Sequence, residues 1–370
     1  MMKAGKYRLM PLLVLALVIA SCINDEDWFE LNSPLQVDLT SSGLFIVNEG
    51  NFNFVNSSLS YYDIDSMKVL NQVFYRTNNV PIGDVAYSMQ IRDSLGYIVV
   101  NNSEMIYVID INSFEYRGRI TGLTSPRHIH FISDTKAYVT DLYAKSITII
   151  NPQTYEISGY IDVHNGASEF YQHPTEEMVQ YGKYVFTNCW SYDNKILVID
   201  SETDQLVDSI EVALQPVSIK LDRYNKLWVL SDGSFEGSAY GWEAPALTRI
   251  DAETRVVEKE IRFDPDDLPS SLCMNGSRDT LYFLNRHVYH LPVYSEAEPE
   301  ILIESTYSEA TSGYFGLTSD PHNSDLYLAD AVDFVQQGLV YRFRSDGSPV
   351  DTFQVGVAPG AFCFKVGSRD

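Results

Sequence analysis

The chain has 370 residues, with 26 basic and 50 acidic side chains and a formal net charge of −24. This acidity excludes a nucleic-acid binder, because contacts to phosphates need Lys and Arg, and it is typical of an exposed soluble protein. The cysteines at positions 189, 273 and 363 follow no regular spacing, which excludes a disulfide framework and a CxxC metal pair.

The first segment has the pattern of a secretory signal. Three basic residues precede the apolar run LLVLALVIA, which is too short to span a bilayer. The run ends in IASC (19–22), which resembles a bacterial lipobox. We expect a signal peptide over residues 1–21 and lipidation of Cys22; the alternative is an ordinary signal peptide with an incidental cysteine. Cleavage before Cys22 removes only the three positive charges, so the mature chain would carry −27.

An acidic run, INDEDWFE (23–30), follows directly. It resembles the surface-export signal of Bacteroidota lipoproteins. We therefore expect residues 22–42 to form a lipidated acidic tether and the protein to lie on the outer membrane, exposed at the cell surface.

Seven short segments then share one pattern, an apolar strand with an aromatic residue that closes on Asn, Asp or Ser. Their aromatic residues lie 41 to 54 positions apart, near the period of roughly 40–50 residues for a four-stranded propeller blade. Short alternating runs without helical periodicity predict an all-β chain. We predict a seven-bladed β-propeller over residues 43–370, with repeats at LFIVN (44–48), GYIVVN (96–101), AYVTD (137–141), YVFTN (184–188), LWVLSD (227–232), LYFLN (281–285) and LYLAD (326–330).

The last strand of the pattern lies at the C-terminus. APGAFCFKV (358–366) matches the strand that opens the later units, such as QPVSIKLD (215–222), yet no unit follows it. The first unit lacks such a strand. We predict that Ala361–Val366 is the innermost strand of the first blade, which closes the ring and leaves no open sheet edge.

Two of the copies carry a family resemblance. KAYVTDLYAKSITIINPQTYEISGYIDV (136–163) and KYVFTNCWSYDNKILVIDSETDQLVDSIEV (183–212) resemble the YVTN-type β-propeller repeat. The resemblance covers residues 43–366 and implies the fold; it implies little about function, since propellers carry many activities.

The turns between the second and third strands of each blade are expected on one face, around a central funnel. The strand ends there are Asn or Asp, which commonly bond to the nearby backbone. The functional alternative is a polar ring that offers amide donors and acceptors to a ligand. These residues are Asn48, Asn101, Asp141, Asn188, Asp232, Asn285 and Asp330.

Aromatic residues at irregular positions in the same loops are better candidates for binding. The repeat does not require them, and clustered exposed aromatics usually mark a binding surface. The long first loop, NEGNFNFVNSS (48–58), is thus predicted to be part of a binding rim. The rim aromatics are Phe52, Phe54, Tyr143, Trp190, Tyr192, Phe235, Tyr240, Trp242 and Phe334.

The sequence predicts no enzyme, no catalytic residue, no metal and no cofactor. The seven histidines are scattered, and there is no GxSxG elbow. Calcium-dependent hydrolase propellers use Glu, Asn and Asp around the funnel, so Asp141, Asn188 and Asp330 keep a hydrolase as a remote alternative.

The motif FIVNEGNF…NSSLSYYD (45–63), the repeats and the lipobox together resemble the cobalamin-capture lipoproteins of gut Bacteroidota. That resemblance implies cobalamin as a transported ligand and a TonB-dependent outer-membrane vitamin B12 transporter as partner. Asn can match corrinoid carboxamides, and aromatics can lie against the corrin edge. A glycan-binding or adhesion propeller would also use aromatic platforms and stays open. The candidate ligand-binding residues are Asn51, Phe52, Phe54, Arg127, Tyr143, Asn188, Trp190, Tyr192, Tyr240, Trp242 and Tyr314.

The export prediction can be tested in cells. Cys22→Ala should leave the protein folded but soluble or mis-sorted, because the lipid anchor is lost. Replacing Asp25, Glu26 and Asp27 by Ala should keep it on the membrane but hide it from protease added outside. Unchanged protease sensitivity of the triple variant would contradict surface export.

Overall fold

The computed structural model describes Leu35 and residues 41–166, 172–239, 241–307 and 314–365. The chain divides into two units, Met1–Gln36 and Val37–Asp370. The predicted signal peptide, Cys22, most of the predicted tether and Tyr240 lie outside the described residues. No helix in the described part of the chain is long and apolar enough to cross a membrane.

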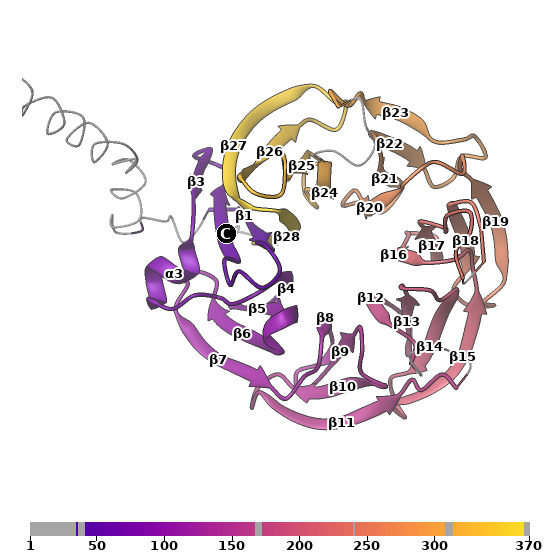
Figure 1. Cartoon of the computed structure of the whole chain (residues 1–370), viewed down its shortest axis with the longest axis horizontal. Helices are drawn as coiled ribbons and strands as arrows, with labels where there is room; N and C mark the ends of the chain where they lie inside the picture. Colours follow the sequence, from indigo (N-terminus) through magenta and orange to yellow (C-terminus); the bar gives the residue numbers. More distant parts are fainter. Residues whose placement is uncertain (1–34, 36–40, 167–171, 240, 308–313, 366–370) are drawn as a thin grey trace, which may run out of the picture. The chain divides into compact units, whose positions relative to one another are not determined.

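The second unit is an all-β, seven-bladed β-propeller, as predicted. The described residues form seven four-stranded antiparallel sheets arranged around a centre, one strand of each lying innermost (Figure 1). Each sheet is given from its innermost strand outward. The first four in chain order contain β28 (Pro359–Lys365), β1 (Gly43–Asn48), β2 (Ser58–Asp63), β3 (Lys68–Leu70); β4 (Ala86–Arg92), β5 (Leu95–Val100), β6 (Met105–Asp110), β7 (Tyr116–Thr121); β8 (Pro126–Ser133), β9 (Lys136–Asp141), β10 (Ser146–Asn151), β11 (Glu156–Asp162); and β12 (Thr175–Tyr181), β13 (Tyr184–Cys189), β14 (Lys195–Asp200), β15 (Gln205–Glu211).

The remaining three sheets follow the same order from the centre outward. They contain β16 (Pro216–Leu221), β17 (Lys226–Ser231), β18 (Ala246–Asp251), β19 (Val257–Arg262); β20 (Ser270–Met274), β21 (Thr280–Asn285), β22 (His287–Pro292), β23 (Glu300–Ile303); and β24 (Tyr314–Ser319), β25 (Leu326–Asp330), β26 (Gln337–Phe343), β27 (Pro349–Val357).

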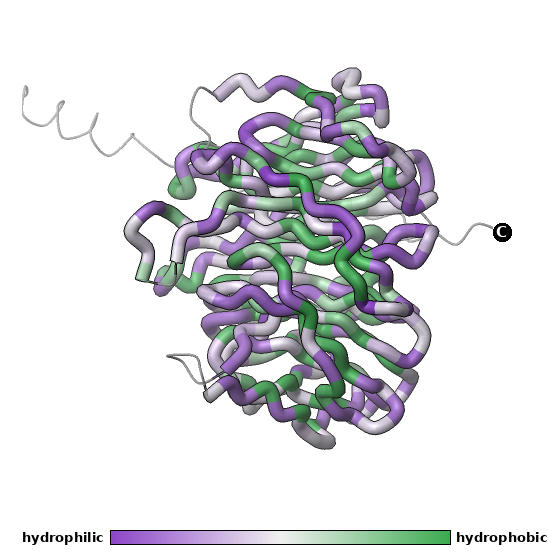
Figure 2. The backbone as a smooth tube through the Cα atoms, turned by 90° about the vertical axis from the view of Figure 1, so that its right-hand side faces the viewer, coloured by the Kyte–Doolittle hydropathy of each residue, from purple (hydrophilic) through white to green (hydrophobic). Residues whose placement is uncertain are grey.

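The core lies between neighbouring blades, and the predicted repeat segments supply it. Their strands are buried over almost their whole length, as in β1 and β25, because both faces of a blade pack on another blade. The outermost strands are largely exposed, as in β15. Hydrophobic stretches accordingly lie along the strands, whereas many turns are hydrophilic (Figure 2).

The ring closes as the sequence predicts. β28 pairs antiparallel with β1 from Gly43↔Lys365 to Asn48↔Pro359. Phe362 and Phe364 pack against the cluster that joins the first and last blades. In the same cluster Tyr62 stacks on Phe353, with ring centroids 4.0 Å apart. Burial of these rings makes the closure apolar as well as hydrogen-bonded.

In the described part of the chain, two short helices interrupt the β pattern. α3 (Val73–Asn78) lies in the connection from the first blade to the second, and η1 (Asn101–Ser103) is a single 3₁₀ turn. Val73 and Phe74 of α3 are fully buried, so tertiary packing stabilises a helix too short to show a periodic pattern.

Deletion of residues 358–370 should abolish cooperative unfolding or cause aggregation, because it removes β28 and exposes the edge of β1. If the variant remains soluble, we expect the melting temperature to fall by roughly 10 °C or more. The matched control deletes only residues 366–370, which follow β28, and should melt as the full chain does. Equal melting of both variants in calorimetry would show that the closure contributes no stability.

Candidate functional site

The innermost strand of every blade shifts register where it leaves the inter-blade loop. In β4, for example, Ala86 pairs with Val100 and Ser88 with Val99, which leaves Tyr87 unpaired between them. Such bulges turn extra side chains out of the sheet. Because seven strands do this at the same level, the extra residues form a ring, here called the throat: Tyr87, Arg127, His128, Glu176, Glu177, Val217, Ser271, Leu272, Phe315 and Gly360.

A central cavity of about 590 Å³ lies along these strands. All throat residues except Glu176 line it, and Glu49, Gln90, Trp190 and Lys220 line it as well. The lining therefore combines acids, bases and aromatic rings. Such a cavity offers orientation by polar groups and contact area by apolar ones.

Arg127 is the best-held charged side chain of the throat. Its Nε donates to both carboxylate oxygens of Glu176, at 2.8 and 2.9 Å, and its guanidinium lies 3.4 Å from the ring centroid of Tyr87. The Tyr87 hydroxyl donates to the same carboxylate at 3.3 Å. Among the described residues, the two terminal amino groups of Arg127 have no hydrogen-bond partner. A ligand in the cavity could therefore bind to both.

Glu49 lies at the end of β1, beside this cluster. Burial raises the pKa of its carboxyl to about 7; Arg127 opposes the rise and Glu176 adds to it. A Cβ atom on Gly360 would come within 2.3 Å of Glu49 Oε1, so glycine at that position gives the carboxyl its space. Near neutral pH Glu49 can donate or accept a hydrogen bond.

A second charged group lies next to the first. Burial alone would raise the pKa of Glu177, but Lys220, His128 and the backbone N–H of Ile219 bring it below its usual value. Lys220 Nζ lies 2.5 Å from the Glu177 carboxylate. Burial lowers the pKa of His128 to about 4, with Arg127 and Lys220 adding to the fall and Glu177 opposing it. His128 is therefore neutral at physiological pH.

The first loop is held on both sides, as a fixed rim would require. The Asn51 amide donates to the carbonyl of Phe334 in the last blade, and the N–H of Asn53 donates to Asp84 at 2.8 Å in the next connection. Phe334 also contacts Phe315 of the throat, with ring centroids 5.1 Å apart. Asn51 thus has a structural contact that the sequence did not predict.

Large apolar side chains are exposed in the loops between second and third strands, the loops predicted to form the rim. The side chain of Phe52 is 64% exposed and that of Phe54 is 74% exposed. Antiparallel pairing places all these loops at the end of the strands where the throat lies. The exposed rim residues are Phe52, Phe54, Val55, Tyr143, Tyr192, Phe235, Trp242, Phe334 and Val335.

Trp190 lies between rim and throat. It lines the cavity, and its indole N–H donates to Asp232 Oδ2 at 3.4 Å. Burial raises the pKa of Asp232 to about 7, while the bonds from Trp190 and Gln215 oppose the rise. This contact joins the loops of two adjacent blades.

The strand-end polar residues are mostly structural. Asn188 is fully buried and its amide donates to the Pro216 carbonyl of the next blade at 2.6 Å. Asp141 accepts four backbone N–H groups, and Asp330 accepts from Tyr307 and Val332. Asp141 and Asp330 are thus occupied locally, whereas the buried Oδ1 of Asn188 has no hydrogen-bond partner among the described residues. Asp141 and Asp330 belong to no cluster of three or more His, Cys, Asp or Glu in the described part of the chain that could hold a metal.

Of the remaining predicted residues, Tyr314 is partly buried and lies edge-on to Tyr307, with ring centroids 5.4 Å apart. Arg127 is the predicted residue that the structure places most clearly in the cavity. Sequence reasoning missed Glu49, Tyr87, Glu176 and Glu177. For Tyr87, Glu176 and Glu177 the available signal was a charged or aromatic residue at the second or third position of an innermost strand.

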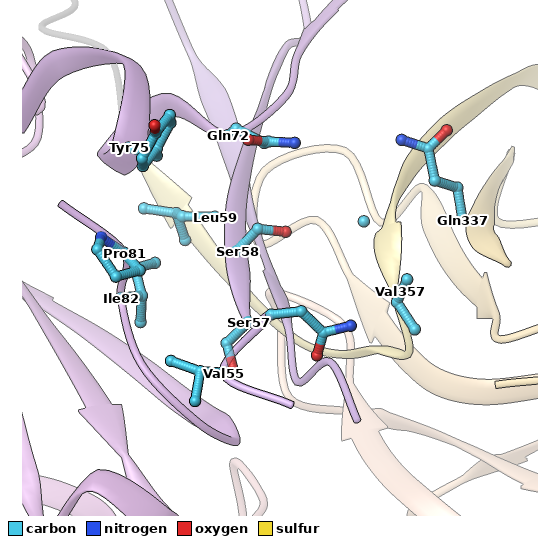
Figure 3. Close-up of a pocket in the computed structure, with 12 residues that line it drawn as sticks. Val55, Ser57, Ser58, Leu59, Gln72, Tyr75, Pro81, Ile82, Gln337 and Val357 are labelled. Atoms are coloured by element: carbon cyan, nitrogen blue, oxygen red, sulfur yellow. The ribbon is translucent and has the colours of Figure 1, made fainter. Parts of the chain in front are cut away.

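A smaller, mainly apolar pocket of about 300 Å³ lies beside the first loop. Leu59, Tyr75, Pro81 and Ile82 face it from one side and Val357 from the other (Figure 3). Val55 of the rim lines it too. The first loop therefore forms part of the rim and also lines this pocket.

The comparisons with known proteins agree on the fold. The family model described as "Domain of unknown function (DUF5074)" matches residues 42–360. A quinonprotein alcohol dehydrogenase-like protein from Bacteroides thetaiotaomicron aligns with a TM-score of 0.65 at 12% identity, over 89% of this chain and 79% of that one. Virginiamycin B lyase from Staphylococcus aureus aligns with a TM-score of 0.57 at 15% identity, over 75% and 87%.

A third structure, apo AztD from Citrobacter koseri, aligns with a TM-score of 0.58 at 11% identity, over 90% of this chain and all of that one. The comparison with curated proteins gives no match. At these identities the likenesses show the propeller fold and nothing about activity.

The raised pKa of Glu49 predicts a pH dependence of stability. Between pH 4.5 and about 7 the folded chain holds a proton that the unfolded chain has released. Stability is therefore lost as the pH rises through this window, by up to about 3 kcal/mol. Glu49→Gln should remove that loss, so its free energy of unfolding should rise relative to wild type from pH 5 to pH 8.

Denaturant unfolding at pH 5 and pH 8 measures the difference in free energy of unfolding between wild type and Glu49→Gln. Glu236 is exposed, and Glu236→Gln is the matched control. Its free energy of unfolding should change with pH as that of the wild type does. A gap between wild type and Glu49→Gln that is equal at pH 5 and pH 8 would contradict the assignment.

Proposed function

The chain belongs to the family described as a domain of unknown function (DUF5074), and we propose that it binds cobalamin or a related corrinoid over the mouth of its propeller. The observation that carries this proposal is the combination of an exposed aromatic rim and a polar cavity at the same end of the strands. In this proposal the protein binds its ligand without altering it.

The rim suits the shape of a corrinoid. The ligand is large and mostly flat, with an apolar edge, carboxamide side chains and a nucleotide tail. Phe52, Phe54, Tyr192 and Trp242 are each about half exposed or more, so they can cover a broad apolar edge without reorganising the core. Aromatic side chains supply such area at low entropic cost.

The throat suits the carboxamides. An amide needs both a donor and an acceptor. The terminal amino groups of Arg127 can donate to the amide oxygen. Glu49 can accept from the amide nitrogen when ionised. Because Glu176 and Tyr87 already hold the guanidinium in place, little side-chain entropy is lost on binding.

The proposed location and partner rest on the N-terminal sequence and the family resemblance. Lipidation at Cys22 and the acidic run behind it would place the propeller outside the outer membrane. From there the protein would pass the corrinoid to a TonB-dependent outer-membrane transporter. Its rigid scaffold and exposed loops are compatible with that exchange.

Calorimetry with cyanocobalamin and the purified chain tests the ligand. We expect Phe54→Ala and Trp242→Ala each to cost about 2 kcal/mol or more, roughly a thirtyfold loss of affinity. Red colour should stay with the wild-type protein through gel filtration. Tyr160→Ala and Tyr294→Ala, which change equally exposed aromatics outside the rim, should bind as wild type does.

No heat and no retained colour at micromolar protein would end the corrinoid proposal and favour a surface glycan as ligand. Tight binding that survives every rim substitution would keep the ligand and exclude this face. Co-purification with the transporter, with and without cobalamin, tests the partner separately.

A further inference from the structure

We propose that His173, Cys189 and Asp193 form a zinc site that clamps the rim loop carrying Trp190 and Tyr192. One ligand atom of each residue lies within 4.8 Å of the other two. No other group of three or more His, Cys, Asp or Glu in the described part of the chain meets that condition. This inference does not depend on the corrinoid proposal.

Three different segments bring these side chains together. Cys189 is the last residue of β13 and is fully buried. Asp193 lies in the turn before β14, where the N–H of Asn194 donates to its Oδ1 at 2.7 Å. His173 precedes β12, and its backbone N–H donates to Val163 at 3.0 Å. The positions are therefore fixed by backbone contacts rather than by flexible side chains alone.

The ligand set indicates the metal. One thiolate, one imidazole and one carboxylate are typical zinc ligands, and three protein ligands leave a fourth position for water. Calcium and magnesium prefer oxygen ligands, so a buried thiol argues against them. Binding replaces the thiol proton, which leaves to solvent, and uses the neutral imidazole.

Metal entry requires a small rearrangement. His173 Nδ1 lies 2.6 Å from Asp193 Oδ2, whereas two such ligands of a tetrahedral zinc lie roughly 3.3 Å apart at usual bond lengths. The pair must therefore open by roughly 0.7 Å. Both side chains are partly exposed, His173 at 15% and Asp193 at 9%, which gives them room and gives the ion a path.

The loop between Cys189 and Asp193 has a conformation that a clamp would stabilise. Ser191 and Tyr192 are consecutive non-glycine residues with φ of 65° and 68°. That region of backbone space is unfavourable for such side chains. A metal bound at both ends of the loop would hold Trp190 at the cavity and Tyr192 on the rim.

The full chain, freed of metal by chelation, should bind one Zn²⁺ in equilibrium dialysis. Cys189→Ser, His173→Gln and Asp193→Asn should each weaken binding by roughly tenfold or more. With Co²⁺ as the probe, the wild type should show a thiolate-to-cobalt charge-transfer band that Cys189→Ser lacks. Cys273→Ser, which removes another buried free thiol, should keep the band and the affinity.

Zinc bound equally by wild type and all three variants would mean adventitious binding to acidic surface groups and would overturn the proposal. So would the absence of stoichiometric binding. If Cys189→Ser fails to fold, the partly exposed His173→Gln and Asp193→Asn decide the matter. These measurements need no corrinoid, so their failure leaves the proposed ligand untouched, and the reverse also holds.

Discussion

The pairing of β28 with β1 is the constraint on which the rest of the propeller depends. Without it the first blade lacks an innermost strand, and the edge of β1 is left without a partner. The same pairing brings Gly360 beside Glu49. It also lets the backbone N–H of Glu49 donate to the carbonyl of Ala358 at 2.9 Å. One contact between distant parts of the sequence thus closes the ring, completes the throat and fixes a charged group at its wall.

The throat follows from closure and from the shared register shift of the innermost strands. At a bulge, two residues of the innermost strand lie opposite one residue of the second strand. A side chain that would otherwise pack into the blade therefore points to the centre of the ring. The centre of the ring can then hold charges that a blade interior could not. Arg127, Glu176 and Tyr87 compensate one another there, because a buried ion pair is tolerated only when hydrogen bonds satisfy it. Burying these charges costs desolvation free energy that stability alone does not require. Their position in the cavity therefore favours a role in binding.

The rim adds contact area to this chemistry. Its loops are not free segments: the first is bonded to the last blade and to the connection that leads to the second blade, and the loop carrying Trp190 reaches Asp232 of the next blade. Preorganised loops lose less entropy on binding. The zinc clamp and the corrinoid site are separate proposals, yet both concern how exposed aromatics are held in position above a polar cavity.

The sequence by itself determined the all-β class, the seven repeats, the C-terminal strand that closes the ring and the loops that carry exposed aromatics. These are local patterns, or comparisons of one stretch with another, and periodicity carries them. Arg127 was a candidate from the sequence, and tertiary structure alone decided which other charged residues line the cavity. Asn188, a candidate ligand residue from the sequence, donates to the backbone of the next blade. Asp141 accepts backbone N–H groups of its own blade. The sequence did not single out Glu49 and Glu176, which lie at the throat because register between strands distant in sequence sets where their side chains point.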